Sequence, residues 1–429
     1  MTGRDPRVFL TGFPGFLGSA LIERLIARGE GPIACLVQPA YIDVARRRAD
    51  EIEARVAGDR FDNGSDEGSA GSGTENGSVG DEAEDDSAAG DVARDGSVGD
   101  EARDGSVGDE ARDGSVDSDE PAAESTPMIQ LYPGDITEPD LGLGADRDDL
   151  VGVGSVYHLA AIYDLGVERR PAEAVNVRGT EHVLDAAESW GASRFHHVST
   201  CYVSGRYDGV FTEADFAVGQ RFNNHYEATK FHAERAVRER TGSDLRATIY
   251  RPSIVVGDSR TGETDKFDGP YYLLGLLRAQ PSWLTVAVSL PGSADAELNV
   301  VPRDYVVDAI AELSRREETA GGVYHLCDQS PLPVDRFVEE LAAALGHRTA
   351  RVTVPRSLAR WGLSLLERLG VPIEPEAVAY LDHPTRYAAP ATRRALSTSE
   401  VGVPPVESYL DRLVAYAEAN PTVGDEPMV

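Results

Sequence analysis

The chain has 429 residues, a formal net charge of −32, and hydrophobic residues at 41% of its positions. This acidity excludes nucleic acid as a partner, because there is no basic stripe to neutralise phosphates. The three cysteines, Cys35, Cys201 and Cys327, are scattered, which excludes a disulfide framework and a paired-cysteine metal site. No apolar run reaches the length of about 18 residues that a membrane span needs. Since no leader precedes the first strand, we expect a soluble, cytoplasmic protein.

Lysine is almost absent from the chain. Only two of the 41 basic residues are lysines, Lys230 and Lys266, and the others are arginines. An acidic, lysine-poor surface stays soluble where molar salt screens charge repulsion, so the composition predicts a halophilic protein. The alternative explanation is arginine codon bias in a GC-rich genome.

The N-terminal region predicts a strand, a glycine-rich turn, a helix and a second strand. The strands are expected at Val8–Leu10 and Ile33–Val37, the helix at Ser19–Ala27, and a further helix at Ile42–Val56. A strand–helix–strand unit of about 30 residues requires a crossover connection, which makes the two strands parallel.

An acidic, low-complexity segment follows. Residues 58–126 contain 22 acidic residues and 4 arginines, and ARDGSVGDE recurs there from Ala93, Ala102 and, with a changed ending, Ala111. The segment has too little apolar surface to offset the entropy of ordering, so we predict a disordered insertion in a surface loop. A calcium-binding β-roll is the alternative that the repeat raises, but its glycines and aspartates do not follow that pattern.

Strands and helices then alternate again, which predicts an α/β fold with a doubly wound parallel sheet of the Rossmann type and a smaller C-terminal substrate lobe. The later strands are expected at 128–131, 155–158, 194–198 and 246–250, and the helices at 172–189, 226–240, 334–345 and 358–369. The predicted divisions are 1–57 and 128–255 for the dinucleotide-binding and catalytic domain, 58–127 for the insertion, 256–420 mainly for the lobe, and 421–429 for a flexible tail.

The turn TGFPGFLG carries the first functional signal. Its glycines allow a tight turn, close approach of a pyrophosphate and close packing of helix on strand, and the helix that follows directs N–H groups at phosphate. The candidate cofactor-binding residues here are Thr11, Gly12, Pro14, Gly15, Phe16, Leu17 and Gly18.

The second signal is the spacing of Tyr226 and Lys230 on a predicted helix. Residues four apart share a helix face, and a nearby ammonium lowers a tyrosine pKa, which makes the phenol a usable acid and base. The alternative to a catalytic role is that Tyr226 is a core residue and Lys230 a surface residue, with no function in common. The chain has only two lysines, and one of them is at this position. This favours the catalytic interpretation.

The third signal is HHVSTCYVSG at the end of a predicted strand, where a hydroxyl could polarise a carbonyl. We favour Thr200 for this role. Ser199 is equally explained as a residue that caps the strand end.

Taken in order, TGFPGFLG, GDIT, HLAA, NVRGT, VST, YEATK and YRPSIVVG resemble the motifs of the extended short-chain dehydrogenases over nearly the whole chain outside the insertion. The resemblance implies that Asp135 and Ile136 hold the adenine and that Ala160 lies along the nucleotide. It implies a catalytic trio of Thr200, Tyr226 and Lys230, with Lys230 also bonding the nicotinamide ribose. Asn176 and the Arg251–Pro252 turn are interpreted as structural.

Within that superfamily, GDSRTGETDKFDGPYYLL at 257–274 is similar to fatty acyl-CoA reductases and thioester-reductase domains. This implies an NAD(P)-dependent oxidoreductase that reduces a carbonyl or acyl-thioester substrate, with Tyr226 as proton donor. The alternatives are a nucleotide-sugar epimerase or dehydratase with a retained cofactor, and a non-catalytic nucleotide sensor. We expect a small, apolar substrate, and many superfamily members form homodimers.

The choice of cofactor depends on the residue after the second strand. An acidic residue there favours NAD and an arginine favours NADP, but this chain has Gln38. The next helix carries three arginines, Arg46, Arg47 and Arg48. They could reach a 2′-phosphate, or they could form the solvent-exposed face of that helix. We favour NADP and leave NAD open, and no metal site is expected.

Overall fold

A computed structural model describes residues 7–64, 127–289, 296–355, 357–358, 361–362, 380–421 and 423. Residues 1–59 and 126–429 form one compact unit, and residues 60–125 form a second unit, of which only residues 60–64 are described. The predicted insertion and its repeats therefore lie almost entirely outside the described residues. The same holds for most of the predicted helix at 358–369 and for nearly all of the tail.

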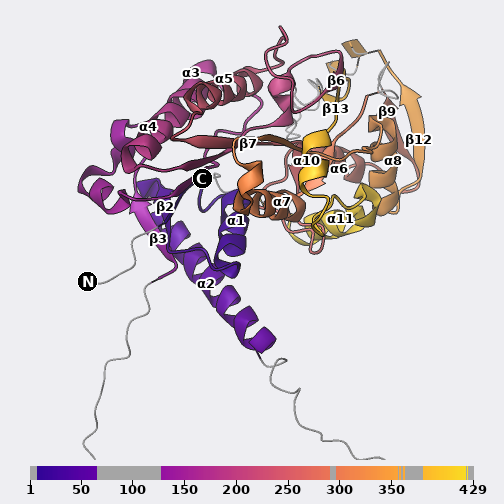
Figure 1. Cartoon of the computed structure of the whole chain (residues 1–429). Helices are drawn as coiled ribbons and strands as arrows, with labels where there is room; N and C mark the ends of the chain where they lie inside the picture. Colours follow the sequence, from indigo (N-terminus) through magenta and orange to yellow (C-terminus); the bar gives the residue numbers. More distant parts are fainter. Residues whose placement is uncertain are drawn as a thin grey trace, which may run out of the picture. The chain divides into compact units, whose positions relative to one another are not determined.

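A parallel sheet forms the centre of the larger unit (Figure 1). It has seven strands in the order β11-β7-β5-β4-β1-β2-β3. Its strands are β1 (Val8–Thr11), β2 (Ile33–Val37), β3 (Ile129–Pro133), β4 (Ser155–His158), β5 (Arg194–Val198), β7 (Arg246–Pro252) and β11 (Val323–Leu326). From β1, the strand order proceeds through β2 to β3 at one edge of the sheet, and from β4 it proceeds through β5 and β7 to β11 at the other edge. The order reverses between β1 and β4, and ligands of doubly wound sheets bind at such a switch point.

Helices cover both faces of this sheet (Figure 1). One face carries α1 (Phe16–Ala27), α2 (Ile42–Gly64) and α7 (Arg303–Arg315), and the other carries α3 (Arg169–Ala172), α4 (Thr180–Trp190) and α5 (His225–Arg240). A π-helical stretch, Glu173–Gly179, joins α3 to α4. The predicted doubly wound α/β architecture is therefore confirmed.

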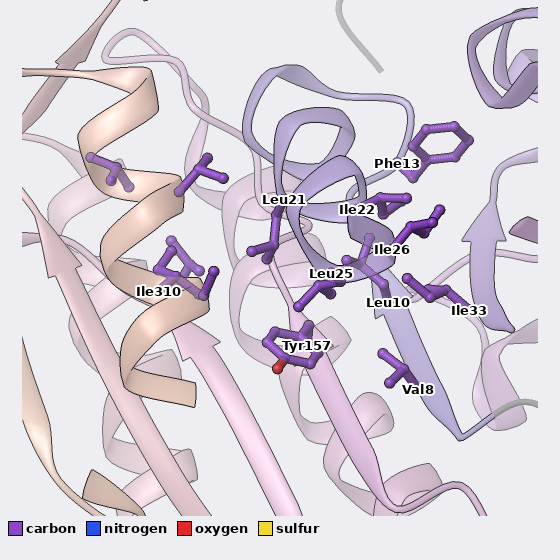
Figure 2. Close-up of a cluster of buried hydrophobic side chains, with 14 of the residues drawn as sticks. Val8, Leu10, Phe13, Leu21, Ile22, Leu25, Ile26, Ile33, Tyr157 and Ile310 are labelled. Atoms are coloured by element: carbon purple, nitrogen blue, oxygen red, sulfur yellow. The ribbon is translucent and has the colours of Figure 1, made fainter. Parts of the chain in front are cut away.

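The core beneath α1 shows how the sequence produces this layer (Figure 2). Leu21 and Leu25 project from α1, and Ile310 projects from α7, and all three are fully buried. Residues four apart lie on one helix face, so Leu21 and Leu25 together form an apolar stripe against α7 and the sheet. This packing fixes the position of α1, whose first turn faces the strand switch point.

A smaller C-terminal lobe has its own apolar core. Its elements are α6 (Pro270–Arg278), α8 (Val334–Ala344), α11 (Leu410–Ala419) and the strand pair β9 (Thr285–Ser289) and β12 (Thr349–Thr353). Two further parallel pairs join β8 (Ile254–Val256) to β10 (Val300–Pro302), and β6 (Gly209–Phe211) to β13 (Thr385–Tyr387). The short helix α10 (Pro390–Ala395) packs near β11.

The local sequence pattern predicted the position of most helices and strands correctly. The strands predicted at 33–37, 155–158 and 194–198 have the predicted bounds. The single helix expected over 172–189 is instead a π-helical stretch followed by α4. Neither α7 nor β11 was predicted; both lie within the span assigned mainly to the lobe, yet they complete the large sheet and its helical layer. The position of β11 is set by pairing with β7, more than 70 residues earlier, which local periodicity does not report.

Across the described ranges, every helix is too short or too polar to cross a lipid bilayer.

Leu25→Ala is expected to lower the free energy of unfolding by about 2–5 kcal/mol, because it leaves a cavity between α1, α7 and the sheet. Val44→Ala is the matched control: Val44 is 38% exposed on α2, and its truncation should change stability by less than about 0.5 kcal/mol. Urea unfolding at constant salt measures both. Equal losses in the two variants would show that the interface between α1 and α7 is not the stabilising core described above.

Candidate active site

A cleft lies where the parallel strands end, at the switch point between β1 and β4. It is lined by the glycine-rich turn after β1, the loop after β4, the end of β5, helix α5, and the segment after β7. Loops from both sides of the switch point therefore meet at one cavity, as expected for the ligand crevice of this architecture.

The turn after β1 fits a phosphate group. Gly12 has φ +93°, and a Cβ there would lie 2.9 Å from the backbone nitrogen of Ala160, so a side chain would close the approach to the loop after β4. Helix α1 begins at Phe16, its N-cap Gly15 provides no side-chain cap, and its first turn holds no acidic residue. The first N–H groups of a helix have no intrahelical partner, and with the helix dipole they attract an anion.

Five of the predicted cofactor-binding residues in this turn line the cleft: Gly12, Gly15, Phe16, Leu17 and Gly18. Thr11 and Pro14 are not among the residues that line it. The Thr11 hydroxyl lies 2.8 Å from His158 Nδ1 and accepts a hydrogen bond from the Ala160 amide at 3.2 Å. Thr11 therefore holds the loop after β4 in place.

Asp135 and Ile136 lie beyond β3 and do not line the cleft. The Asp135 carboxylate accepts hydrogen bonds from the amide and hydroxyl of Thr137, both at 2.8 Å, and from the side-chain amide of Gln38 at 3.0 Å. Ile136 packs closely against Gly179. The contact between Gln38 and Asp135 joins the ends of β2 and β3, the edge at which the adenine end of the nucleotide was expected.

The three predicted catalytic residues meet in the cleft. Thr200 follows β5, and Tyr226 and Lys230 lie one turn apart on α5. The Lys230 ammonium donates a hydrogen bond to the Val198 carbonyl at 2.8 Å, which ties α5 to the end of β5. Ala160, predicted to lie along the nucleotide, lines the same cleft.

Burial governs the proton affinities of Tyr226 and Lys230. Burial raises the pKa of Tyr226, and a hydrogen bond with Thr200 acts in the opposite direction. Burial also lowers the pKa of Lys230 to about 8, against the effect of the Glu234 carboxylate, which raises it. The sequence argument expected the ammonium to lower the tyrosine pKa; here the removal of both groups from water is the larger effect.

A fully buried ion pair lies beneath the trio. Arg251 on β7 donates to both carboxylate oxygens of Glu234 on α5, at 3.0 and 2.7 Å, and neither side chain is exposed. The Ser199 hydroxyl donates to the same carboxylate at 2.7 Å. Burial by itself would raise the pKa of Glu234, but Arg251 holds it below its usual value. Arg251 and Ser199 therefore position α5 and the end of β5.

Asn176 has a similar positioning role from the π-helical stretch. Its side chain accepts a hydrogen bond from the Ile162 amide at 2.8 Å and donates one to the Thr229 hydroxyl at 3.0 Å. Asn176 thus connects the loop after β4 to α5, in agreement with the structural interpretation drawn from the sequence.

Several residues that line the cleft were not predicted. Tyr163, Tyr202 and Ile254 form an apolar wall, and Lys266 and Asp268 provide charged groups. The Tyr163 ring stands perpendicular to the Tyr226 ring, with centroids 5.1 Å apart. The rarity of lysine in the chain was the one available signal for Lys266.

Cys201, His325 and Cys327 lie close together in the core, with their potential ligand atoms within 4.8 Å of one another. These groups have protein partners: the Cys201 thiol donates to the Arg251 carbonyl, and His325 Nε2 faces the Arg251 guanidinium at 3.1 Å. Burial raises the pKa of the Cys201 thiol. A positive charge beside this cluster disfavours a metal cation, so we assign the three residues to the core.

The fold and the cleft together define an extended short-chain dehydrogenase. The sequence model of the NAD-binding family described as male sterility protein matches residues 10–67 and 100–310. The chain belongs to this family and is an NAD(P)-dependent oxidoreductase.

Individual relatives agree with this assignment. The 3β-hydroxysteroid dehydrogenase/Δ5→4-isomerase of Mycobacterium tuberculosis is 28% identical over 284 residues, which is 60% of this chain and 71% of that protein. The fatty acyl-CoA reductase wat of Drosophila melanogaster is 27% identical over 211 residues, or 43% of this chain and 40% of that protein. The terminal R domain of the myxalamid biosynthetic pathway shares the fold, with a TM-score of 0.69 and 22% identity over 99% of this chain and 93% of that domain.

Arg251→Met is expected to lower the free energy of unfolding by about 3 kcal/mol, because it leaves the buried Glu234 carboxylate with only Ser199 and the partly exposed Arg238 as partners. The double variant Glu234→Met/Arg251→Met removes both charges and should recover a large part of that loss. Urea unfolding of both variants measures the difference. A double variant no more stable than the single one would contradict a charge-pairing role for Arg251.

Proposed function

We propose that this oxidoreductase reduces acyl thioesters, or the aldehydes derived from them, with NADPH. The observation that carries the proposal is the presence of Thr200, Tyr226 and Lys230 in one cleft with the glycine-rich turn. The apolar wall formed by Tyr163, Tyr202 and Ile254 suits an acyl chain. The name of the fly relative, a fatty acyl-CoA reductase, supports the same substrate class.

Each member of the trio has a distinct role in this proposal. Thr200 donates a hydrogen bond to the carbonyl oxygen of the substrate, and Tyr226 donates a proton to that oxygen. The Lys230 ammonium stabilises the phenolate that Tyr226 leaves behind.

Bound NADPH would supply the hydride, held by its pyrophosphate at the turn of Gly12 and at the start of α1. Hydride on the carbonyl carbon and a proton on its oxygen convert a thioester to a thiohemiacetal. Cleavage of its carbon–sulfur bond releases a thiol and an aldehyde, so the two electrons and the proton are accounted for.

The two alternative functions have less support. A nucleotide-sugar epimerase would use a cation for the substrate diphosphate. The two arginines considered for this role, Arg278 and Arg303, do not line the cleft, and Arg303 is stacked on Phe16 at 4.9 Å and paired with Glu263 at 3.4 Å. A non-catalytic sensor has no need of a proton donor, yet Tyr226 and Lys230 both face the cleft.

The preference for NADPH rests on the start of α2, which follows Gln38. Arg46 pairs with Asp43 at 3.0 Å and Arg48 approaches Glu51 at 3.8 Å, while Arg47 is exposed. We assign Arg47 to the 2′-phosphate of the cofactor. The acidic, lysine-poor composition supports a high-salt environment, so the assays below use molar potassium chloride.

Tyr226→Phe is expected to cut turnover of a long-chain acyl-CoA by at least about 100-fold, because it removes the proton donor, while NADPH affinity stays nearly unchanged. Loss of reduced-nicotinamide absorbance measures turnover, and cofactor fluorescence measures binding. Tyr324→Phe is the control, since that hydroxyl donates to the Thr319 carbonyl outside the cleft. A Tyr226 variant that retains most of its activity would remove this residue from the mechanism.

Arg47→Ala is expected to raise the KM for NADPH about tenfold or more, the scale of a lost hydrogen bond to a charged group, and to leave the KM for NADH unchanged. Arg55→Ala is the control on the same helix, because Arg55 pairs with Glu23 on α1. Steady-state kinetics with both cofactors measure the effect. Equal changes for NADPH and NADH would show that Arg47 does not contact the 2′-phosphate.

A further inference from the structure

The strand pair of the C-terminal lobe carries exposed tryptophan. Of the three tryptophans in the chain, Trp190 is buried in the core, whereas Trp283 is 73% exposed and Trp361 is 63% exposed. Tryptophan has a large apolar ring and is on average one of the more buried residue types. Trp283 lies just before β9, and Trp361 follows β12, the strand that pairs with β9.

The β9–β12 pair has one covered face and one exposed face. Helices α6 and α8 pack against it, and the side chains of Thr285, Ala287 and Ser289 are buried. Alternate residues of a strand point to opposite faces. Val286, at 38% exposed, therefore points away from the helices, and the strand register places Val352, at 44%, on the same face. Figure 1 shows β12 at the outer edge of the lobe.

The loop before β9 extends this exposed face. The Thr285 amide donates a hydrogen bond to the Arg348 carbonyl at 2.8 Å, and the Arg348 amide donates one to the Ser282 carbonyl at 2.9 Å. Trp283 and Leu284, which is 42% exposed, lie between these two bonds. Neighbouring exposed apolar side chains, unlike scattered single ones, indicate an interaction site. We call this area the lobe patch, and its residues are Trp283, Leu284, Val286 and Val352.

The sequence that forms the lobe patch contains no acidic residue. Residues 269–294 and 341–366 hold five arginines and no aspartate or glutamate, although 73 of the 429 residues in the chain are acidic. Arg278 at the end of α6 and Arg348 are exposed, and among the described residues neither side chain has an ion-pair or hydrogen-bond partner. A third arginine, Arg351, is paired with carboxylates of α8. The patch therefore combines apolar side chains with two unpaired cations in a strongly acidic chain.

A lipid surface fits this combination better than a protein does. Tryptophan favours the boundary between lipid headgroups and acyl chains, and arginine binds phosphate. A protruding indole enters a fluid interface without a preformed pocket, whereas a protein partner has to offer a complementary one. In a symmetric dimer the patch would face its own copy, so Arg278 and Arg348 of both chains would meet without a carboxylate to neutralise them.

We propose that the lobe patch binds the surface of an anionic lipid bilayer, with Trp283 and Leu284 among the headgroups and with Arg278 and Arg348 on lipid phosphates. The binding is peripheral, as in other proteins that place an apolar surface with flanking cations in the interface. Molar salt screens the repulsion between the lipid and the acidic remainder of the chain beyond about 3 Å, so direct contacts decide the binding.

Helix α6 connects the lobe patch to the cleft. The helix begins two residues after Asp268, which lines the cleft, and it ends at Arg278. At about 1.5 Å per residue, its 9 residues span about 13 Å. An enzyme bound through the lobe patch would therefore hold its cleft close to apolar molecules dissolved in the bilayer.

Flotation of the full chain with large unilamellar vesicles in molar potassium chloride tests this inference without any turnover. The wild type should float with vesicles made of equal parts phosphatidylglycerol and phosphatidylcholine. Trp283→Ser should lower the partition coefficient about tenfold, the scale of leaving one large apolar side chain in water. Val151→Ser is the control, because Val151 is an apolar residue 64% exposed in the loop before β4, and its partition should not change.

Arg348→Gln tests the contribution of charge. It should weaken binding to the phosphatidylglycerol vesicles about threefold and leave binding to pure phosphatidylcholine vesicles unchanged. Urea unfolding of each variant should match the wild type, since the substituted side chains are exposed.

Three outcomes would overturn the inference. The first is a wild type that stays in the aqueous fraction with both kinds of vesicle. The second is vesicle binding that neither Trp283→Ser nor Arg348→Gln weakens, because another surface would then be responsible. The third is a dimer, detected by light scattering, that Trp283→Ser dissociates while the wild type binds no vesicles; the lobe patch would then be a protein interface.

Discussion

The buried pair of Glu234 and Arg251 joins the helix that carries Tyr226 and Lys230 to β7, the strand between β5 and β11 in the large sheet. Both side chains are inaccessible to water, and the guanidinium contacts both carboxylate oxygens. Two charges in the interior are costly unless their geometry satisfies both, so the pair holds α5 and β7 in one orientation. The bond from Ser199 to Glu234 brings the end of β5 into the same arrangement. The direction in which Tyr226 faces depends on this network.

The cleft then follows from the reversal of strand order. Because the chain leaves β1 and β4 toward opposite faces of the sheet, the glycine-rich turn and the loop after β4 leave room between them. Thr11 links the two loops through His158 and Ala160. The C-terminal lobe closes the other side of the cleft with the segment that carries Lys266. Cofactor and substrate would therefore meet between elements more than 200 residues apart in the chain.

Charge is distributed unevenly in this protein. Arginine and acidic side chains form ion pairs over much of the described surface, whereas the two lysines are kept for the cleft. An ammonium loses its charge more readily on burial than a guanidinium does. This accounts for the lowered pKa of Lys230, about 8, in a chain that otherwise relies on arginine. Net charge alone does not explain why both lysines of the chain line this cleft.

The sequence by itself determined the parallel α/β architecture, the glycine-rich turn, and the placement of Thr200, Tyr226 and Lys230 at one site. These features depend on local rules: apolar periodicity, turn glycines, helix spacing, and the meeting of strand ends at one edge of a sheet. Only the tertiary structure decided that β11 completes the sheet, that Asp135 and Ile136 lie outside the cleft, and that Lys266 lies inside it. It also reversed the expected pKa shift of Tyr226. Burial and long-range pairing depend on segments that are distant in the chain, and local sequence pattern does not report on them.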